Sequence, residues 1–154
     1  MGQRDEFHSL NDATAGLHRV LAPGLTARIF AGDSAMLSIV TVAPHGKGKV
    51  HEHPEEQWGV LLEGSGTRVQ GGEEIAVKEG DFWRTPGGVP HTFHAGPKGA
   101  RILDIFAPPR EEYRRKGEGF GKGAVRHDVA TPSGQTTATP HSQGADHDAR
   151  PAEG

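Results

Sequence analysis

The stretch that decides the fold is His51-Glu52-His53-Pro54-Glu55-Glu56-Gln57. In an extended strand, side chains two positions apart share a face, so His51 and His53 should point the same way. Two imidazoles on one face suit a divalent transition metal. After a tight turn at Pro54, Gln57 can return to the same place. A further ligand must come from elsewhere in the chain, and we expect His91, which closes Pro86-Gly-Gly-Val-Pro-His91.

The residues on either side of this stretch predict short strands joined by turns. The chain of 154 residues contains 23 glycines and 11 prolines, and only 6% of its residues are aromatic. Between residues 25 and 107, turn signals recur roughly every ten residues and no helical period is sustained. We expect hairpins at Glu63-Gly-Ser-Gly66 and at Gly71-Gly72. This spacing predicts an all-β domain, either a sandwich or a small barrel.

The two ends of the chain differ from this middle region. Residues 1–16 are polar and unpatterned, and we interpret them as a flexible N-terminal arm. The β-barrel domain is expected over 17–116, ending in a short helix at Arg110–Lys116 that packs through Tyr113. Residues 117–154 are rich in Gly, Thr, Ser, Pro, Ala and His, so we predict a disordered tail there. The histidines of that tail have no metal-ligand spacing.

Composition argues against several classes of partner. The formal charge of −3 and the lack of a clustered basic patch predict no nucleic-acid partner. No window of 18 apolar residues is present, so no membrane span is expected. The N-terminus lacks the apolar run of a signal peptide. Cysteine is absent, so disulfides and thiol chemistry are excluded. This composition fits a reducing cytoplasm, which is the predicted location, and is also compatible with export.

Two motifs resemble those of the cupin superfamily. The first is a His-x-His pair followed by Glu or Gln and then Gly, and the second is Gly, Pro-x-Gly and His. The matching residues are His51, His53, Gln57 and Gly64 for the first, and Gly80, Pro86, Gly88 and His91 for the second. Two positions depart from the pattern: His45 stands where the first motif begins with Gly, and Ala95 stands where the second ends with Asn.

The resemblance implies a jelly-roll barrel with a metal inside, held by His51, His53, Gln57 and His91. Three imidazoles and a carboxamide oxygen are neutral, so they leave the full +2 charge on the ion and favour Lewis-acid chemistry. They favour oxygen activation less, because two His and a carboxylate are the set expected there. The cofactor is a divalent transition metal: Mn, Fe, Ni or Zn. Glu55 and Glu56 are alternative ligands, although we expect both on the barrel rim.

A narrower resemblance covers Leu103 to Tyr113. This stretch resembles the end of the KdgF-like cupins, which convert 4,5-unsaturated monouronates to linear keto forms. The resemblance implies that Asp104 is a catalytic acid or base, that Phe106 stacks on a sugar ring, and that Arg110 clamps a carboxylate. The structural alternatives are an internal hydrogen bond for Asp104, a core position for Phe106 and a helix cap for Arg110.

Three functions remain open on the sequence. The first is a metal-dependent isomerase or lyase that acts as a Lewis acid, with proton transfer, on a small polar substrate such as a sugar acid. The second is an Fe(II)-dependent dioxygenase. The third is a binding module without turnover. In each case the partner is a small molecule, and by analogy with small cupins we expect a homodimer.

Overall fold

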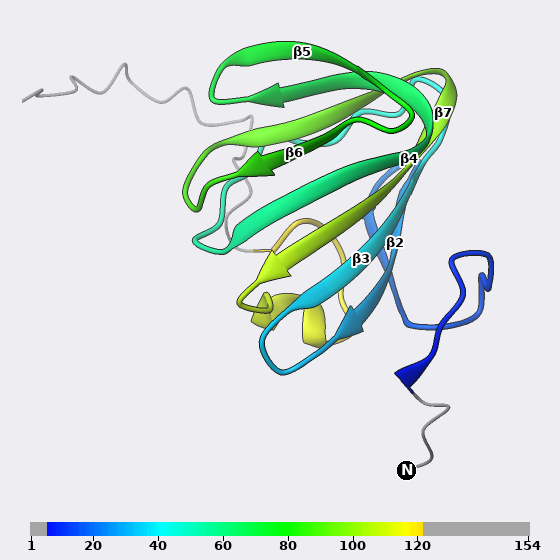
Figure 1. The fold of residues 1–154 in the computed structure, drawn as a ribbon, viewed down its shortest axis with the longest axis vertical. Helices are drawn as coiled ribbons and strands as arrows, with labels where there is room; N and C mark the ends of the chain where they lie inside the picture. Colours follow the sequence, from blue (N-terminus) through cyan, green and yellow to red (C-terminus); the bar gives the residue numbers. More distant parts are fainter. Residues whose placement is uncertain (1–5, 122–154) are drawn as a thin grey trace, which may run out of the picture.

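The computed structural model describes residues 6–121, and within them the chain is almost entirely β-structure (Figure 1). Apart from one short turn of 3₁₀-helix, the elements are strands, which confirms the predicted all-β class. The strands are β1 Leu17–Ala22, β2 Leu25–Ala31, β3 Met36–Val42, β4 Glu56–Gln70, β5 Glu73–Lys78, β6 Phe82–Thr85 and β7 His91–Ala107.

All seven strands belong to one antiparallel sheet, ordered β1-β2-β3-β7-β4-β5, with β6 paired to β4. The long strands β4 and β7 run through both halves of the sheet and bend across it, so that the sheet curls into a barrel (Figure 1). β4 pairs with β6 near Gln57 and with β5 near Arg68, so one strand serves both halves. This curled arrangement is the expected jelly roll.

The bend in β4 replaces one of the predicted hairpins. Glu63–Gly66 does not reverse the chain; it lies inside the 15-residue strand β4, where the register with β7 shifts between Leu61 and Glu63 and again between Gly64 and Gly66. Gly64 has φ +83, and a Cβ there would lie 2.1 Å from the Gly99 carbonyl oxygen, so only glycine fits. Gly71-Gly72 does form the predicted turn, between β4 and β5.

The inner face of the barrel carries apolar side chains together with a few polar ones. Alternate residues of β2 face inward, as at Leu25, Ala27 and Ile29, each at most 3% exposed. Burying each large aliphatic side chain stabilises the fold by about 1.5–3 kcal/mol. The remaining large members of the core cluster are Leu21, Met36, Val40, Val42, Leu61, Phe93, Ile102, Phe106, Tyr113 and Phe120. Phe106 and Phe120 of this cluster pack against His53 and His51, so the core positions the candidate site.

The C-terminal part of the described chain corrects the predicted domain boundary. The short helix is only a turn of 3₁₀-helix, η2 at Glu111–Arg114, which buries Tyr113 as expected. We expected disorder from Gly117, yet residues 117–121 (below, the closing segment) pack on the barrel and Phe120 is 7% exposed. The guanidinium of Arg19 donates to the carbonyls of Glu118 and Gly119, which supplies backbone partners that composition does not reveal. Residues 122–154 of the predicted tail lie outside the described part.

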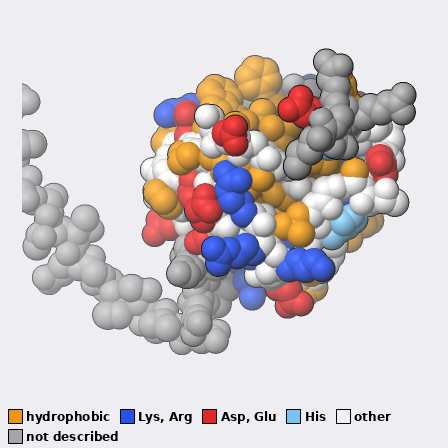
Figure 2. Space-filling view, turned by 90° about the horizontal axis from the view of Figure 1, so that it is seen from below, with side chains coloured by type: hydrophobic (Ala, Val, Ile, Leu, Met, Phe, Trp, Pro, Cys, Tyr) orange, Lys and Arg blue, Asp and Glu red, His pale blue; other side chains and the backbone are white. Residues whose placement is uncertain are grey.

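The N-terminal region and the surface add two observations. Residues 6–16 contain no strand and are mostly exposed, and Arg28 donates hydrogen bonds to the carbonyls of Leu10 and Asp12. The mobility of this arm stays a prediction. On the face in Figure 2, acidic, basic and apolar side chains of the described residues are interspersed, without a continuous basic surface. No helix in the described range is long and apolar enough to cross a membrane.

Candidate metal centre

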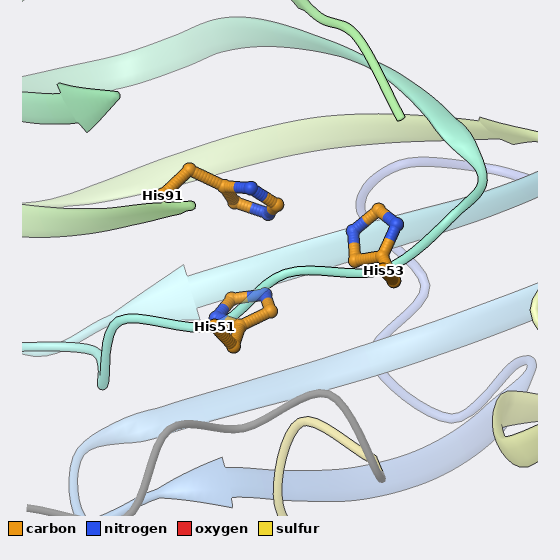
Figure 3. Close-up of side chains that lie close together, drawn as sticks. All are labelled: His51, His53 and His91. Carbon is orange, nitrogen blue, oxygen red and sulfur yellow. The ribbon is translucent and has the colours of Figure 1, made fainter. Parts of the chain in front are cut away.

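Three histidines from two separate parts of the chain converge inside the barrel (Figure 3). The backbones of His51 and His91 exchange hydrogen bonds of 3.1 and 2.9 Å, which ties the His-x-His stretch to the start of β7. The Gly88 N–H donates to the His53 carbonyl, and a Cβ at Gly87 would lie 2.1 Å from the Pro54 carbonyl oxygen. One ligand atom from each of the three imidazoles lies within 4.8 Å of the others. The expected convergence of these side chains is therefore present.

The second ring nitrogen of each histidine fixes which nitrogen faces the centre. The Nδ1 atoms of His51, His53 and His91 lie 2.8, 3.0 and 2.8 Å from backbone carbonyl oxygens. A carbonyl only accepts, so each Nδ1 carries the proton and each Nε2 presents a lone pair. Nε2 of His91 is buried and has no hydrogen-bond partner among the described residues. An orphaned lone pair of this kind fits a metal ligand.

Gln57 completes the group as the sequence predicts. It is the second residue of β4 and is 3% exposed, and its Oε1 lies 3.0 Å from Nε2 of His53. In the tautomer set by the Glu55 carbonyl, both atoms are acceptors. Two acceptors at this distance repel each other unless a cation binds both. The donor set therefore fits a divalent ion held by three imidazoles and a carboxamide.

The histidines stay unprotonated at neutral pH. Burial lowers the pKa of His51 to about 3 and that of His91 to about 2, and it also lowers the pKa of His53. The positive charge of Arg110 acts in the same direction on His51 and His53, and that of Arg68 on His51 and His91. Because metal ligands must be deprotonated, the cluster needs no proton release before it binds an ion.

Glu55 is neither a fourth ligand nor a rim residue. Its Oε2 is buried and lies 3.3 Å from Nδ1 of His53, while its backbone carbonyl accepts from the same nitrogen. A carboxylate behind a ligating imidazole orients the ring and raises its basicity. Glu56 does lie on the rim as expected, paired with Arg84 on β6. Pro54 breaks the strand between the two histidines and Gln57, and this break turns Glu55 inward.

His51 and His91 line a small cavity, the inner chamber, of about 40 Å³. Among the residues that line it are Ser38, Gln57, Asp104 and Phe106. Asp104 lies between Ser38 of β3 and Gly59 of β4 in the sheet, and the surface it retains faces this chamber. Burial raises the pKa of Asp104 to about 6, against the opposing effects of Arg68, Gln57 and Arg110. Asp104 therefore lines the same chamber as His51 and His91, and its catalytic role stays a prediction.

The other two predicted site residues lie differently. Phe106 is 3% exposed and packs edge-on against His53, with ring centroids 5.5 Å apart. Arg110 is 1% exposed but does not line the inner chamber: its guanidinium lies 4.2 Å from the Tyr113 ring centroid and donates to the Phe120 carbonyl. Nε and Nη1 of Arg110 are buried and have no partner among the described residues.

Sequence reasoning missed two residues of the chamber. Arg68 is 5% exposed and lines the chamber, although it follows directly on the hairpin that the sequence predicts at Glu63–Gly66. Phe120 stacks on His51, with ring centroids 4.2 Å apart and planes 21° apart. A lone aromatic in an otherwise polar tail was the available signal for Phe120. For Arg68, no local signal was available, because the bulges of β4 set its direction.

The comparisons with known proteins agree with this architecture. Residues 38–106 match the family described as "Cupin domain". No curated protein matches the sequence. Among solved structures, an RmlC-like cupin from Shewanella frigidimarina aligns with TM-score 0.61 and 21% identity, covering 70% of this chain and 96% of that chain. KdgF from a Halomonas species aligns with TM-score 0.60 and 21% identity, covering 69% and 98%.

Oxalate decarboxylase from Bacillus subtilis is a third match, with TM-score 0.58 and 21% identity. The alignment covers 72% of this chain and 33% of that chain, so the present chain corresponds to about a third of that enzyme. A further structure of that enzyme is described for its Mn(II) centers. At these identities the structural likenesses show the fold alone. The sequence match identifies a cupin domain over residues 38–106 of this chain, and the solved structures share its fold.

Proposed function

We propose that this cupin is a metal-dependent enzyme of the isomerase or lyase type, acting on a small polar acid such as a sugar acid. The three histidines and Gln57 would hold a divalent transition metal, and Asp104 would transfer the proton. The observation that carries the proposal is the pairing of two features inside the barrel. Three imidazoles turn their lone pairs toward one another, and the carboxyl group of Asp104 lies in the chamber that His51 and His91 also line.

When bound, the ion would supply Lewis acidity toward a substrate oxygen. The protein supplies the proton transfer and the dry environment. The carboxyl group of Asp104 opens into the chamber, where it can accept a proton from a substrate carbon or hydroxyl and return it. Gln57 lowers the pKa of this carboxyl, and its Oε1 lies 3.0 Å from Nε2 of His53, so it lies between the carboxyl and the histidine cluster. A chamber of about 40 Å³ holds few water molecules, which strengthens these interactions.

Substrate binding would use the two remaining residues of the KdgF-like pattern. Phe106 offers a ring face beside His53, and Arg110 keeps Nε and Nη1 free of described partners for a carboxylate. The inner chamber has room for only about three waters. A sugar acid therefore enters only when Phe120 moves off His51, which would also give it access to Arg110.

The test compares metal content and turnover in matched variants. His51→Ala combined with His91→Ala should lose the metal while circular dichroism shows an intact β-barrel. Asp104→Asn should keep the metal and lose at least 100-fold in turnover, whereas Asp33→Asn, in an exposed turn, should keep both.

Turnover is followed as the loss of ultraviolet absorbance of 4,5-unsaturated monouronates, with a panel of hydroxy and keto acids beside them. Full metal occupancy in the double histidine variant would remove these residues from the site. Oxygen consumption during turnover would instead identify a dioxygenase, and saturable binding without turnover would identify a binding module. The homodimer is proposed by analogy, and light scattering of the full chain checks it.

A further inference from the structure

Arg68 is a buried cation without an ion pair. Its side chain projects inward from β4 and is 5% exposed. Within the described residues, no carboxylate oxygen lies within 4.0 Å of its nitrogen atoms. Burial lowers the pKa of Arg68 to about 10, and the negative charge of Asp104 opposes this effect. A buried charge costs several kcal/mol unless it is compensated. Packing alone gives no reason to retain an arginine here.

Neutral groups hold the guanidinium in a fixed position. Nη2 donates to Thr85 Oγ1 at 2.8 Å and Nε donates to Gln70 Oε1 at 3.3 Å. The Thr85 hydroxyl donates in turn to Gln70 Oε1, and the Gln70 amide donates to the Arg84 carbonyl. The Trp83 ring lies below, 5.4 Å from the guanidinium carbon. This frame uses two of the five N–H donors of Arg68, so three remain for another partner.

The position of Arg68 places those donors at the candidate site. Arg68 lines the inner chamber together with His91 and Asp104. It also lines a second, outer pocket of about 420 Å³ between β5 and β6, with Phe82 and Trp83 as walls. A ligand held by Arg68 can thus reach toward the histidines.

The two buried arginines flank the cluster on different sides. Arg68 lies on the His91 side, because Gln70, which holds its guanidinium, is paired with His91 in the sheet. The guanidinium of Arg110 instead lies on the Tyr113 ring and donates to the Phe120 carbonyl. Neither guanidinium has an ion pair among the described residues, and Asp104 is the one carboxylate that both of them affect. Of the two guanidinium groups, Arg68 is the one that lines the chamber, so its three remaining N–H groups can meet an anionic ligand there.

We propose that Arg68 is a specificity-determining residue that binds one carboxylate of a dicarboxylic acid, on the His91 side of the chamber. This inference rests on the proposed function in taking the chamber as a substrate site. The planar fork of Arg68 pairs with a carboxylate through two parallel hydrogen bonds, and it is already oriented by Thr85 and Gln70. The second carboxylate lies toward Arg110. An acid with a single negative charge would leave one buried guanidinium uncompensated.

The test measures preference for two negative charges over one. Oxalate, malonate and succinate are each compared with their monoamides oxamate, malonamate and succinamate by isothermal titration calorimetry on the full chain. The wild type should bind at least one diacid tenfold or more tightly than its monoamide. Arg68→Met and Arg68→Gln should lower that ratio below threefold. Arg84→Met, at an exposed arginine of β6, should leave the ratio unchanged.

Two neutral variants are used so that a failure of one to fold does not end the test. Because no ion pair is lost, the melting temperature of Arg68→Met without ligand should not fall. The inference is overturned if the wild type prefers none of the three diacids, or if both folded Arg68 variants keep the tenfold preference. Each titration is run on metal-loaded and on chelator-treated protein. Failure of the proposed metal site appears separately, as absence of metal from the wild type.

Discussion

Replacing Phe120 with alanine tests how the closing segment is held on the barrel. The segment gains about 3 kcal/mol from burial of the Phe120 ring and about 1 kcal/mol from each hydrogen bond. Four such bonds involve its backbone: two from Arg19, one from Arg110, and one from the Gly119 N–H to the Val20 carbonyl. Ordering residues 117–121 costs about 1.5 kcal/mol per residue, or about 7 kcal/mol in all. The two contributions nearly cancel, so docking of this segment is marginal.

A marginally docked segment limits the cost of the substitution. Once the segment detaches, no more stability can be lost, so Phe120→Ala should lower the free energy of unfolding by only about 1 kcal/mol. Phe106→Ala, at an equally buried ring within β7, cannot detach in this way and should cost about 3–5 kcal/mol. Phe82→Ala, at a ring that is 69% exposed, should change stability by less than about 0.5 kcal/mol.

Urea unfolding measures the three free energies, and amide hydrogen exchange follows the segment directly. In Phe120→Ala the Gly119 amide should lose protection while the amides of β4 and β7 keep theirs. Metal uptake should also become faster, because the ring no longer covers His51. A cost for Phe120→Ala equal to that of Phe106→Ala would mean that the segment belongs to the cooperative core, and the reasoning above would be refuted.

Two further predictions concern the histidine cluster. Glu55→Gln should weaken metal affinity about 10–100-fold, because the carboxylate behind His53 is lost. Competition with a chelator measures the affinity, and Glu56→Gln on the rim is the control. Equal effects of the two substitutions would contradict the role of Glu55 in orienting His53. Lowering the pH should destabilise the metal-free protein, since unfolded histidines take up protons below pH 6.5 while folded His51 and His91 do not until about pH 3 and 2. Stability should be constant above pH 6.5 and fall by about 1.4 kcal/mol per pH unit for each of these two residues, roughly 4 kcal/mol by pH 5. Asp104, whose pKa burial raises to about 6, takes up a proton in the folded state below pH 6 and offsets about 1.4 kcal/mol of this loss, which leaves roughly 3 kcal/mol. Urea unfolding between pH 7.5 and 5 checks this, and a flat profile would show that the imidazoles are not buried as described.

The sequence by itself determined the parts of the protein that depend on local spacing. The glycines and prolines between residues 25 and 107 predict where strands end in turns. Glycine permits positive φ and proline lacks a backbone N–H, and both properties affect only the few residues around them. The His-x-His pair and Gln57 lie within seven residues of one another, so a strand and one turn suffice to bring them together. His91 could be predicted as a site residue because the second motif was recognisable. Asp104 could be predicted because the strand that holds it was recognisable.

Tertiary structure alone decided the remaining features of the site. Two bulges in β4 change which residues face inward, so Arg68 enters the chamber from a stretch whose composition predicts a hairpin. Phe120 is buried because Arg19, about a hundred residues earlier, supplies hydrogen bonds to the backbone beside it. Arg110 is turned onto Tyr113 by the same packing. Such contacts join residues far apart in the chain, and the free energy that fixes them comes from burial and charge in the folded barrel, which no local pattern encodes.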